Sequence, residues 1–172
     1  MPSDSSITFV RPPELATRAP YAYAAVVGPG RTVFTAGACP LDAEGRTVAP
    51  GDVAGQAGQV MANLVTALHA AGAGLDDVVK TTVFVASSSQ DDLVVAWDVV
   101  RAAFGDHDAP STLLGVTVLG YDDQLVEVEA VAVISAGAGR RERRGTLNGA
   151  EHHPAASGLS SGRSPISAGR YP

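Results

Sequence analysis

Residues 125–134 read LVEVEAVAVI, and two kinds of side chain alternate along this stretch. Successive side chains of a β-strand point to opposite faces of a sheet, so the alternation predicts a strand with two unlike faces. The small apolar face, which suits packing against helices, carries Val126, Val128, Ala130, Ala132 and Ile134. The other face carries Leu125, Glu127, Glu129, Val131 and Val133. This second face places two carboxylates among apolar side chains.

Two amphipathic helices are predicted to pack against the apolar face. The first follows Asp52, a suitable N-cap, and ends at the glycines Gly72 and Gly74. Its apolar residues recur every three or four positions, at Val53, Ala57, Val60, Leu64 and Leu68. The second follows a stretch rich in Ser and Asp, and its apolar face holds Leu93, Trp97, Val100 and Phe104. Two glycines inside the first helix, Gly55 and Gly58, are expected to permit a close approach of another backbone.

Further strands are predicted from β-branched and aromatic residues and from turn signals. They are 22–28 and 31–38, joined at Gly28-Pro29-Gly30, then 77–86, and then 111–119, joined to 125–134 by residues 120–123. The order β-β-α-β-α-β-β predicts an α+β sandwich with two helices on one face of a mostly antiparallel sheet. Because the sequence offers no third helix for the other face, we expect the protein to cover that face by oligomerisation.

Composition and charge separate residues 1–136 from residues 137–172. The first part carries 16 acidic and six basic side chains, a net charge of −10, which disfavours nucleic acid and anionic membranes as partners. The second part, rich in Gly, Ser and Arg, has a net charge of +4 and few large apolar residues. We expect one domain followed by a disordered tail.

The sequence also favours a cytoplasmic protein without a metal. No apolar run is long enough to span a bilayer, and the first residues do not resemble a secretory signal. The single cysteine, Cys39, excludes an internal disulfide framework. With four histidines and no CxxC or HExxH motif, we expect no metal site.

Several motifs together resemble the RidA family, the YjgF/YER-type enamine and imine deaminases. They are APYAYAAV (19–26), TVFTAGACPLDAEG (32–45), KTTVFVA (80–86), APSTLLGV (109–116) and LVEVEAVAV (125–133), in family order over roughly residues 8–135. The resemblance implies a chorismate-mutase-like fold and a homotrimer. It also implies clefts between subunits where water attacks a C=N bond and ammonia leaves, with no cofactor and a small-molecule substrate.

The same resemblance implies roles for individual residues. Glu127 corresponds to the residue that positions or activates water, and Tyr21 to the tyrosine of the cleft, although Tyr23 fits if the count is made without a gap. Gly37 corresponds to a glycine whose backbone approaches the substrate. The implied substrate-binding set is Gly37, Ala38, Cys39, Trp97, Ser111, Leu113 and Glu129.

Two positions depart from the family pattern. Ser111 stands where deaminases have an arginine that clamps the substrate carboxylate, and a hydroxyl cannot form the bidentate pair of a guanidinium. Trp97 stands where the family has a polar asparagine. Cys39 lies beside the expected cleft, and we interpret it as a small buried thiol in preference to a nucleophile, because no neighbouring His or Lys would activate it.

Two functional hypotheses follow. The first is a hydrolase that releases ammonia from a small imine or enamine, with Glu127 and Tyr21 as catalytic residues. The second is a non-catalytic trimer of the same fold that binds a small molecule or protects other proteins. The pair of Glu127 and Tyr21 favours the first hypothesis, and Ser111 favours the second.

Overall fold

The computed structural model describes residues 7–136. The predicted disordered tail, residues 137–172, therefore lies outside the described residues. The domain boundary predicted after residue 136 falls at their end. The strands are β1 (Ile7–Val10), β2 (Ala24–Val27), β3 (Gly30–Phe34), β4 (Val78–Val85), β5 (Ser111–Gly115) and β6 (Val126–Ser135). The helices are α1 (Val53–Ala70) and α2 (Gln90–Phe104), with a short 3₁₀ turn at Leu75–Asp77.

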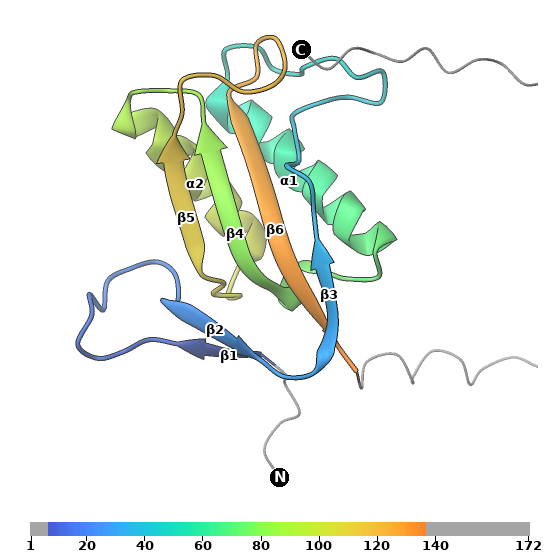
Figure 1. Ribbon diagram of the computed structural model, residues 1–172. Coiled ribbons are helices and arrows are strands. Elements are labelled where there is room, and N and C mark those ends of the chain that lie inside the picture. Colours follow the sequence, from blue (N-terminus) through green and yellow to red (C-terminus); the bar gives the residue numbers. More distant parts are fainter. Residues whose placement is uncertain (1–6, 137–172) are drawn as a thin grey trace, which may run out of the picture. The chain divides into compact units, whose positions relative to one another are not determined.

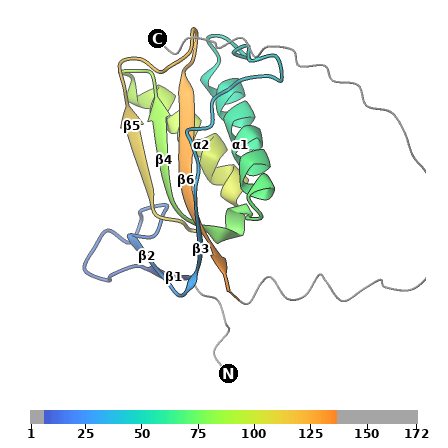
Figure 2. The ribbon, with the colours of Figure 1, turned by 45° about the vertical axis from the view of Figure 1, so that its right-hand side comes forward.

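The main sheet has four strands in the order β3-β6-β4-β5. Strand β6 runs antiparallel to both of its neighbours, whereas β4 and β5 are parallel. Helices α1 and α2 lie side by side on one face of this sheet (Figure 1), and the turned view shows the two layers edge-on (Figure 2). The predicted α+β architecture, with two helices on one face of a mostly antiparallel sheet, is therefore confirmed.

The alternation along β6 holds in the structure. Each residue of its apolar face is buried beneath the helices, with Val126, Val128 and Ala132 fully enclosed. Helix α1 supplies most of the opposing surface through Ala57, Val60, Leu64 and Leu68, all 0% exposed. Burying such side chains stabilises the fold by roughly 1.5–3 kcal/mol for each large one. The Asp52 carboxylate accepts a hydrogen bond from the Gly55 backbone amide, which confirms the predicted N-cap.

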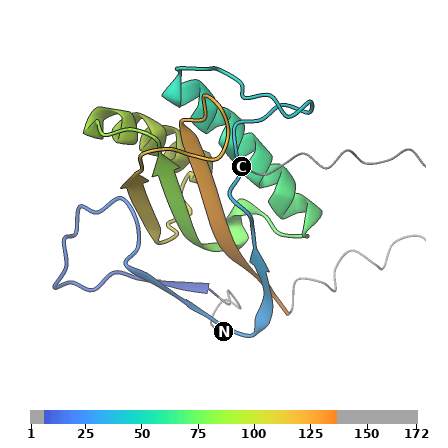
Figure 3. The ribbon, with the colours of Figure 1, turned by 45° about the horizontal axis from the view of Figure 1, so that its top comes forward.

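Strands that are joined directly in the chain do not pair with each other. Strand β2 leads into β3 through Gly28 and Pro29, as predicted, but it forms a separate two-stranded antiparallel sheet with β1, a strand that was not predicted (Figure 3). Strand β5 ends at Gly115, before the predicted residue 119, and does not pair with β6. The reason is that helix α2 carries the chain back to the start of β4, so β5 adds in parallel at its outer edge.

The sheet face opposite the helices remains open within this chain. It presents Phe34, which is 76% exposed, and Leu114, which is 43% exposed. Glu127 is half-buried on this face and Glu129 is exposed. A partner over this face stays a prediction. Among residues 7–136, no helix has the length and apolar character needed to cross a bilayer.

Candidate active site

A bulge after β3 builds the first part of the site. Phe34 pairs with Val131 and Ala38 pairs with Val128, so β3 contributes four residue steps against three on β6. The extra residue leaves the ladder and bends the strand. The Ala38 amide then donates to the Val128 carbonyl at 2.8 Å and fixes the rejoined chain beside β6. This local shape turns Gly37 toward Glu127.

The carboxylate of Glu127 lies directly against the backbone of Gly37. A Cβ atom added to Gly37 would overlap Oε1 of Glu127, so no residue other than glycine fits without moving the carboxylate. The amide of Gln124 donates a hydrogen bond to Oε2 of Glu127 at 3.0 Å, and the thiol of Cys39 donates to the same oxygen at 3.6 Å. We call Gly37, Ala38, Cys39, Gln124 and Glu127 the Glu127 corner.

The thiol of Cys39 is held in its neutral form. Burial, the negative charge of Glu127 and the hydrogen bond to that carboxylate together raise the pKa of Cys39 from 9.0 to about 11. A neutral thiol is a poor nucleophile. This environment agrees with the interpretation of Cys39 as a packed thiol, and it makes Cys39 a neighbour that donates to Glu127.

Amide side chains that the sequence analysis did not single out hold the Glu127 corner in place. Asn63 of α1 donates to the backbone carbonyls of Cys39 and Leu41, at 2.8 and 2.9 Å. Gln56, 0% exposed, accepts from the Leu125 amide at 2.7 Å and donates to the Asp123 carbonyl at 2.8 Å. Their amide side chains thus tie α1 to the two loops that bracket Glu127. A groove of about 430 Å³ runs beside Gly37 and Cys39, although Glu127 does not line it.

Tyr21, Trp97, Ser111 and Leu113, four of the remaining predicted site residues, gather at the opposite edge of the sheet. A groove of about 520 Å³ there is lined by Pro20, Tyr21, Trp97, Ser111, Thr112 and Leu113, which we call the Tyr21 edge. The ring of Tyr21 meets that of Trp97 edge to face, with centroids 6.2 Å apart. The hydroxyl of Tyr23 is bound to the Ala16 carbonyl at 2.8 Å within its own loop. Of the two candidate tyrosines, only Tyr21 lines this groove.

The hydroxyl of Ser111 forms a hydrogen bond within the fold. Its hydroxyl oxygen lies 2.5 Å from that of Thr81, and the register of β4 and β5 sets both residues on the helix side of the sheet. Glu127 lies on the other side, and β4 separates β5 from β6, so about 10 Å of sheet lies between the two strands. One chain therefore carries these residues in two separate groups. Glu129 lies apart from both on the open face, where its charge acts on Lys80 without forming an ion pair with it.

In the described part of the chain, no group of three or more His, Cys, Asp or Glu side chains could hold a metal ion. The chemistry available is that of a carboxylate with neutral hydrogen-bond donors at the Glu127 corner. At the Tyr21 edge it is that of an aromatic groove with hydroxyl groups.

Comparison with known proteins identifies the relatives of this chain. Residues 13–134 match the family described as Endoribonuclease L-PSP. A RutC family protein of Pyrococcus horikoshii is 32% identical over 110 residues, which are 64% of this chain and 85% of that protein. The 2-iminobutanoate/2-iminopropanoate deaminase of Escherichia coli is 34% identical over 106 residues, 60% of this chain and 80% of that enzyme.

Solved structures agree with these sequence relatives. The Rid family protein YyfB of Yersinia pestis superposes with a TM-score of 0.71 at 30% identity, covering 75% of this chain and 99% of that one. The YjgF gene product of E. coli gives a TM-score of 0.52 at 34% identity, over 69% of this chain and 91% of that one. With the sequence match, the shared fold and the motifs in agreement, the chain belongs to the Endoribonuclease L-PSP family, in its RidA/YjgF group.

Proposed function

We propose that this protein hydrolyses the C=N bond of a small imine, or of the imine tautomer of an enamine, and releases ammonia. The observation that carries the proposal is the arrangement of Glu127. One carboxylate oxygen accepts from Gln124 and Cys39, which fixes the group, and the other lies against Gly37. A related enzyme of E. coli is named for the deamination of 2-iminobutanoate and 2-iminopropanoate.

In the proposed reaction, Glu127 accepts a proton from water as the water oxygen bonds to the imine carbon. The same carboxyl then delivers that proton to nitrogen, which gives a carbinolamine. In a second transfer the carboxylate takes the proton of the carbinolamine hydroxyl and passes it to nitrogen, so that the C–N bond breaks and a carbonyl compound and ammonia leave. General acid–base catalysis of this kind typically contributes about 10²–10⁴-fold. The fixed carboxylate suits this role because it needs no rearrangement between the proton transfers.

The separation of the two groups of site residues supports a site shared between subunits. In one chain the Glu127 corner and the Tyr21 edge lie on different strands, Ser111 and Glu127 lie on opposite faces of the sheet, and the grooves beside the two groups share no lining residue. In a ring of three copies, the Glu127 corner of one protomer would meet the Tyr21 edge of the next. The exposed Phe34 and Leu114 supply apolar surface for that homotrimer.

The test is ammonia release from 2-iminopropanoate or 2-aminoacrylate made in situ, with light scattering on the same sample. We expect a trimer that accelerates ammonia release above the spontaneous rate. Leu114→Glu, on the open face, should give monomers without activity. A wild-type monomer that turns over these substrates would overturn the shared site, and an inactive trimer would overturn the hydrolase.

A second candidate function is a non-catalytic trimer that binds a small molecule. The observation that favours it is Ser111, whose hydroxyl is bound to Thr81 and offers no charge to a substrate carboxylate. Ser111→Arg separates the two functions. If the protein is a hydrolase that lacks only the family's clamp, this change raises activity on carboxylated imines. If the protein is a binding protein, both forms bind the ligand and neither releases ammonia.

A further inference from the structure

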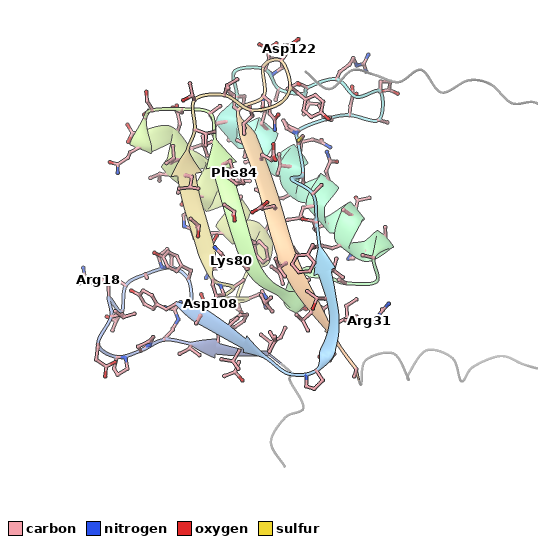
Figure 4. All side chains as sticks on the ribbon, viewed as in Figure 1. Arg18, Arg31, Lys80, Phe84, Asp108 and Asp122 are labelled. Atoms are coloured by element: carbon pink, nitrogen blue, oxygen red, sulfur yellow. The ribbon has the colours of Figure 1, made fainter. Side chains whose placement is uncertain are left out.

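A second groove, continuous with the Tyr21 edge through Tyr21, Ser111 and Thr112, contains a single charged side chain. This groove has a volume of about 480 Å³. It is lined by Tyr21, Ala22, Tyr23, Ala24, Ala25, Val27, Val79, Lys80, Pro110, Ser111 and Thr112. The charged member is Lys80 of β4, which Figure 4 places where the β1–β2 sheet approaches the lower ends of β4 and β5.

The ammonium group of Lys80 is held at two points. It donates to the hydroxyl of Thr112 at 2.6 Å and to the Thr81 carbonyl at 2.8 Å. An ammonium carries three N–H donors, so one remains for a ligand. The Thr112 hydroxyl accepts from Lys80 and keeps its own proton to donate. Together they offer two donors, which matches the two oxygens of a carboxylate.

The charge of Lys80 is not neutralised by a close ion pair. The ion pairs found among residues 7–136 join Arg11 with Asp108 and Arg46 with Asp42 and Glu44. Burial lowers the pKa of Lys80, and the more distant charge of Glu129 opposes that effect. A half-buried cation without a close counter-ion is costly, and an anionic ligand in the groove would offset that cost.

The other nearby cations are poorly placed for this role. Arg31 lies at β3, across the sheet from the groove (Figure 4), with its guanidinium beside Gly72. Arg101 donates to the Gly105 carbonyl. It lines a cavity of only about 10 Å³, which is no larger than the space that one water molecule needs.

We propose that Lys80, with Thr112, binds the carboxylate of the substrate and so replaces the arginine that Ser111 displaces. The inference rests on the proposed function for the identity of the substrate, a small 2-imino acid. It assigns the negative charge of that substrate to the groove beside Tyr21 and leaves the C=N bond to reach Glu127 of the adjoining protomer.

The experiment measures binding and needs no turnover. Pyruvate, the carbonyl product of 2-iminopropanoate hydrolysis, is titrated into the full chain by calorimetry, beside pyruvamide, which has the same shape without the charge. Losing one charge-assisted hydrogen bond should weaken binding by roughly tenfold or more. We therefore expect pyruvate to bind wild type at least that much more tightly than pyruvamide. We expect Lys80→Met to remove this preference and Lys80→Arg to keep most of it.

Arg31→Met and Arg101→Met are the matched controls, and both should bind pyruvate as wild type does. Light scattering and thermal unfolding show whether each variant keeps its assembly and fold. If Lys80→Met fails to assemble, the assignment is still tested by whether wild type prefers pyruvate to pyruvamide and whether the two arginine variants keep that preference. Equal binding of pyruvate and pyruvamide by wild type, or loss of the preference in an arginine variant, would overturn the assignment. Wild type that binds pyruvate through Lys80 but releases no ammonia refutes the hydrolase and leaves this inference standing.

Discussion

The Glu127 corner and the Tyr21 edge differ in how firmly the fold holds them. At the corner, the bulge after β3, the Gly37 backbone and the amide of Gln124 surround one carboxylate. Behind it, Gln56 and Asn63 anchor the flanking loops through buried hydrogen bonds. At the edge, Tyr21 lies on the loop between β1 and β2, held by ring contacts and by an ion pair at the surface.

From this difference we infer that the Glu127 corner and the Tyr21 edge have different roles. The proposed proton transfer needs a carboxylate in one fixed position, and the contacts at the corner leave Glu127 little freedom. Substrate recognition varies with the substrate, and the edge is an open groove whose walls include half-buried rings and hydroxyls. The two positions predicted to depart from the family pattern, Ser111 and Trp97, both lie at the edge. Residues at the corner should therefore affect the rate, and residues at the edge should affect affinity.

The largest effect should come from Glu127→Gln. The amide keeps the shape and can still accept from Gln124, but it cannot exchange a proton with water, so kcat should fall by about 10²–10⁴-fold. Binding of pyruvate should be nearly unchanged. Glu129→Gln, two positions along the same exposed face, is the control and should retain most of the activity. The assay is ammonia release, and loss in the control with full activity in Glu127→Gln would reverse the roles of the two glutamates.

The next effect is the low reactivity of Cys39, the single cysteine of the chain. With its pKa raised to about 11 from 9.0, the thiolate fraction near neutral pH should be roughly a hundredfold lower than in the unfolded chain. Alkylation by iodoacetamide should be correspondingly slow in buffer and fast in denaturant. Glu127→Gln removes a negative charge beside the thiol and should speed the reaction. Rapid alkylation of the folded wild type would contradict this environment.

The raised pKa of Cys39 also makes the stability of the protein depend on pH. Because the pKa of Cys39 is higher in the folded protein than in the unfolded chain, folding favours the neutral thiol. The stability that this supplies is complete below pH 9 and is lost as the pH rises toward about 11. Urea unfolding across this range should show a loss of stability in wild type that is smaller in Cys39→Ala.

The sequence contained enough to predict the layers of the fold, because β6 and α1 carry strongly periodic apolar residues. The pairing of β5 with β4 could not be predicted from the sequence, because the order of the strands depends on how α2 packs and not on any local pattern. The polar anchors were missed for a related reason. Gln56 and Asn63 are residue types usually found at the solvent-facing surface of a helix, and only the folded loops reveal their backbone partners.

The substrate-binding role that the family resemblance gives to Gly37 stays a prediction. The family resemblance marked Gly37 as a glycine whose backbone approaches the substrate, whereas the structure places that backbone against the carboxylate of Glu127. Sequence alone cannot distinguish these two neighbours, because both require the absence of a side chain.

Two glycine substitutions should sharpen the contrast between packed and open positions. Gly37→Ala forces a Cβ into the Glu127 carboxylate, so it should cost about 1–3 kcal/mol of stability and reduce activity by moving that group. A Cβ added to Gly58, inside α1, would meet no atom of the described residues within 4 Å, so the predicted close approach is absent there. Gly58→Ala should stabilise the protein by about 0.5–1 kcal/mol. Chemical denaturation measures both changes, and similar effects at the two positions would be inconsistent with this account.

The smallest effect is expected at the ion pair that positions the loop carrying Tyr21. Arg11 contacts the Asp108 carboxylate at 2.5 Å and donates to the Ala19 carbonyl at 3.0 Å, so it ties this loop to the start of β5. The two side chains are 40% and 24% exposed, and such pairs contribute less than about 1 kcal/mol. Asp108→Asn should therefore leave unfolding almost unchanged but loosen the loop. We expect KM to rise a few-fold with kcat unchanged, and the wild-type KM to rise similarly in high salt, which screens the pair.

Asp42→Asn, which breaks an exposed pair with Arg46 in a different loop, is the control and should leave KM as it is. A fall in kcat without a change in KM would mean that the loop carrying Tyr21 takes part in the chemical step, and the division between the two groups of site residues would fail.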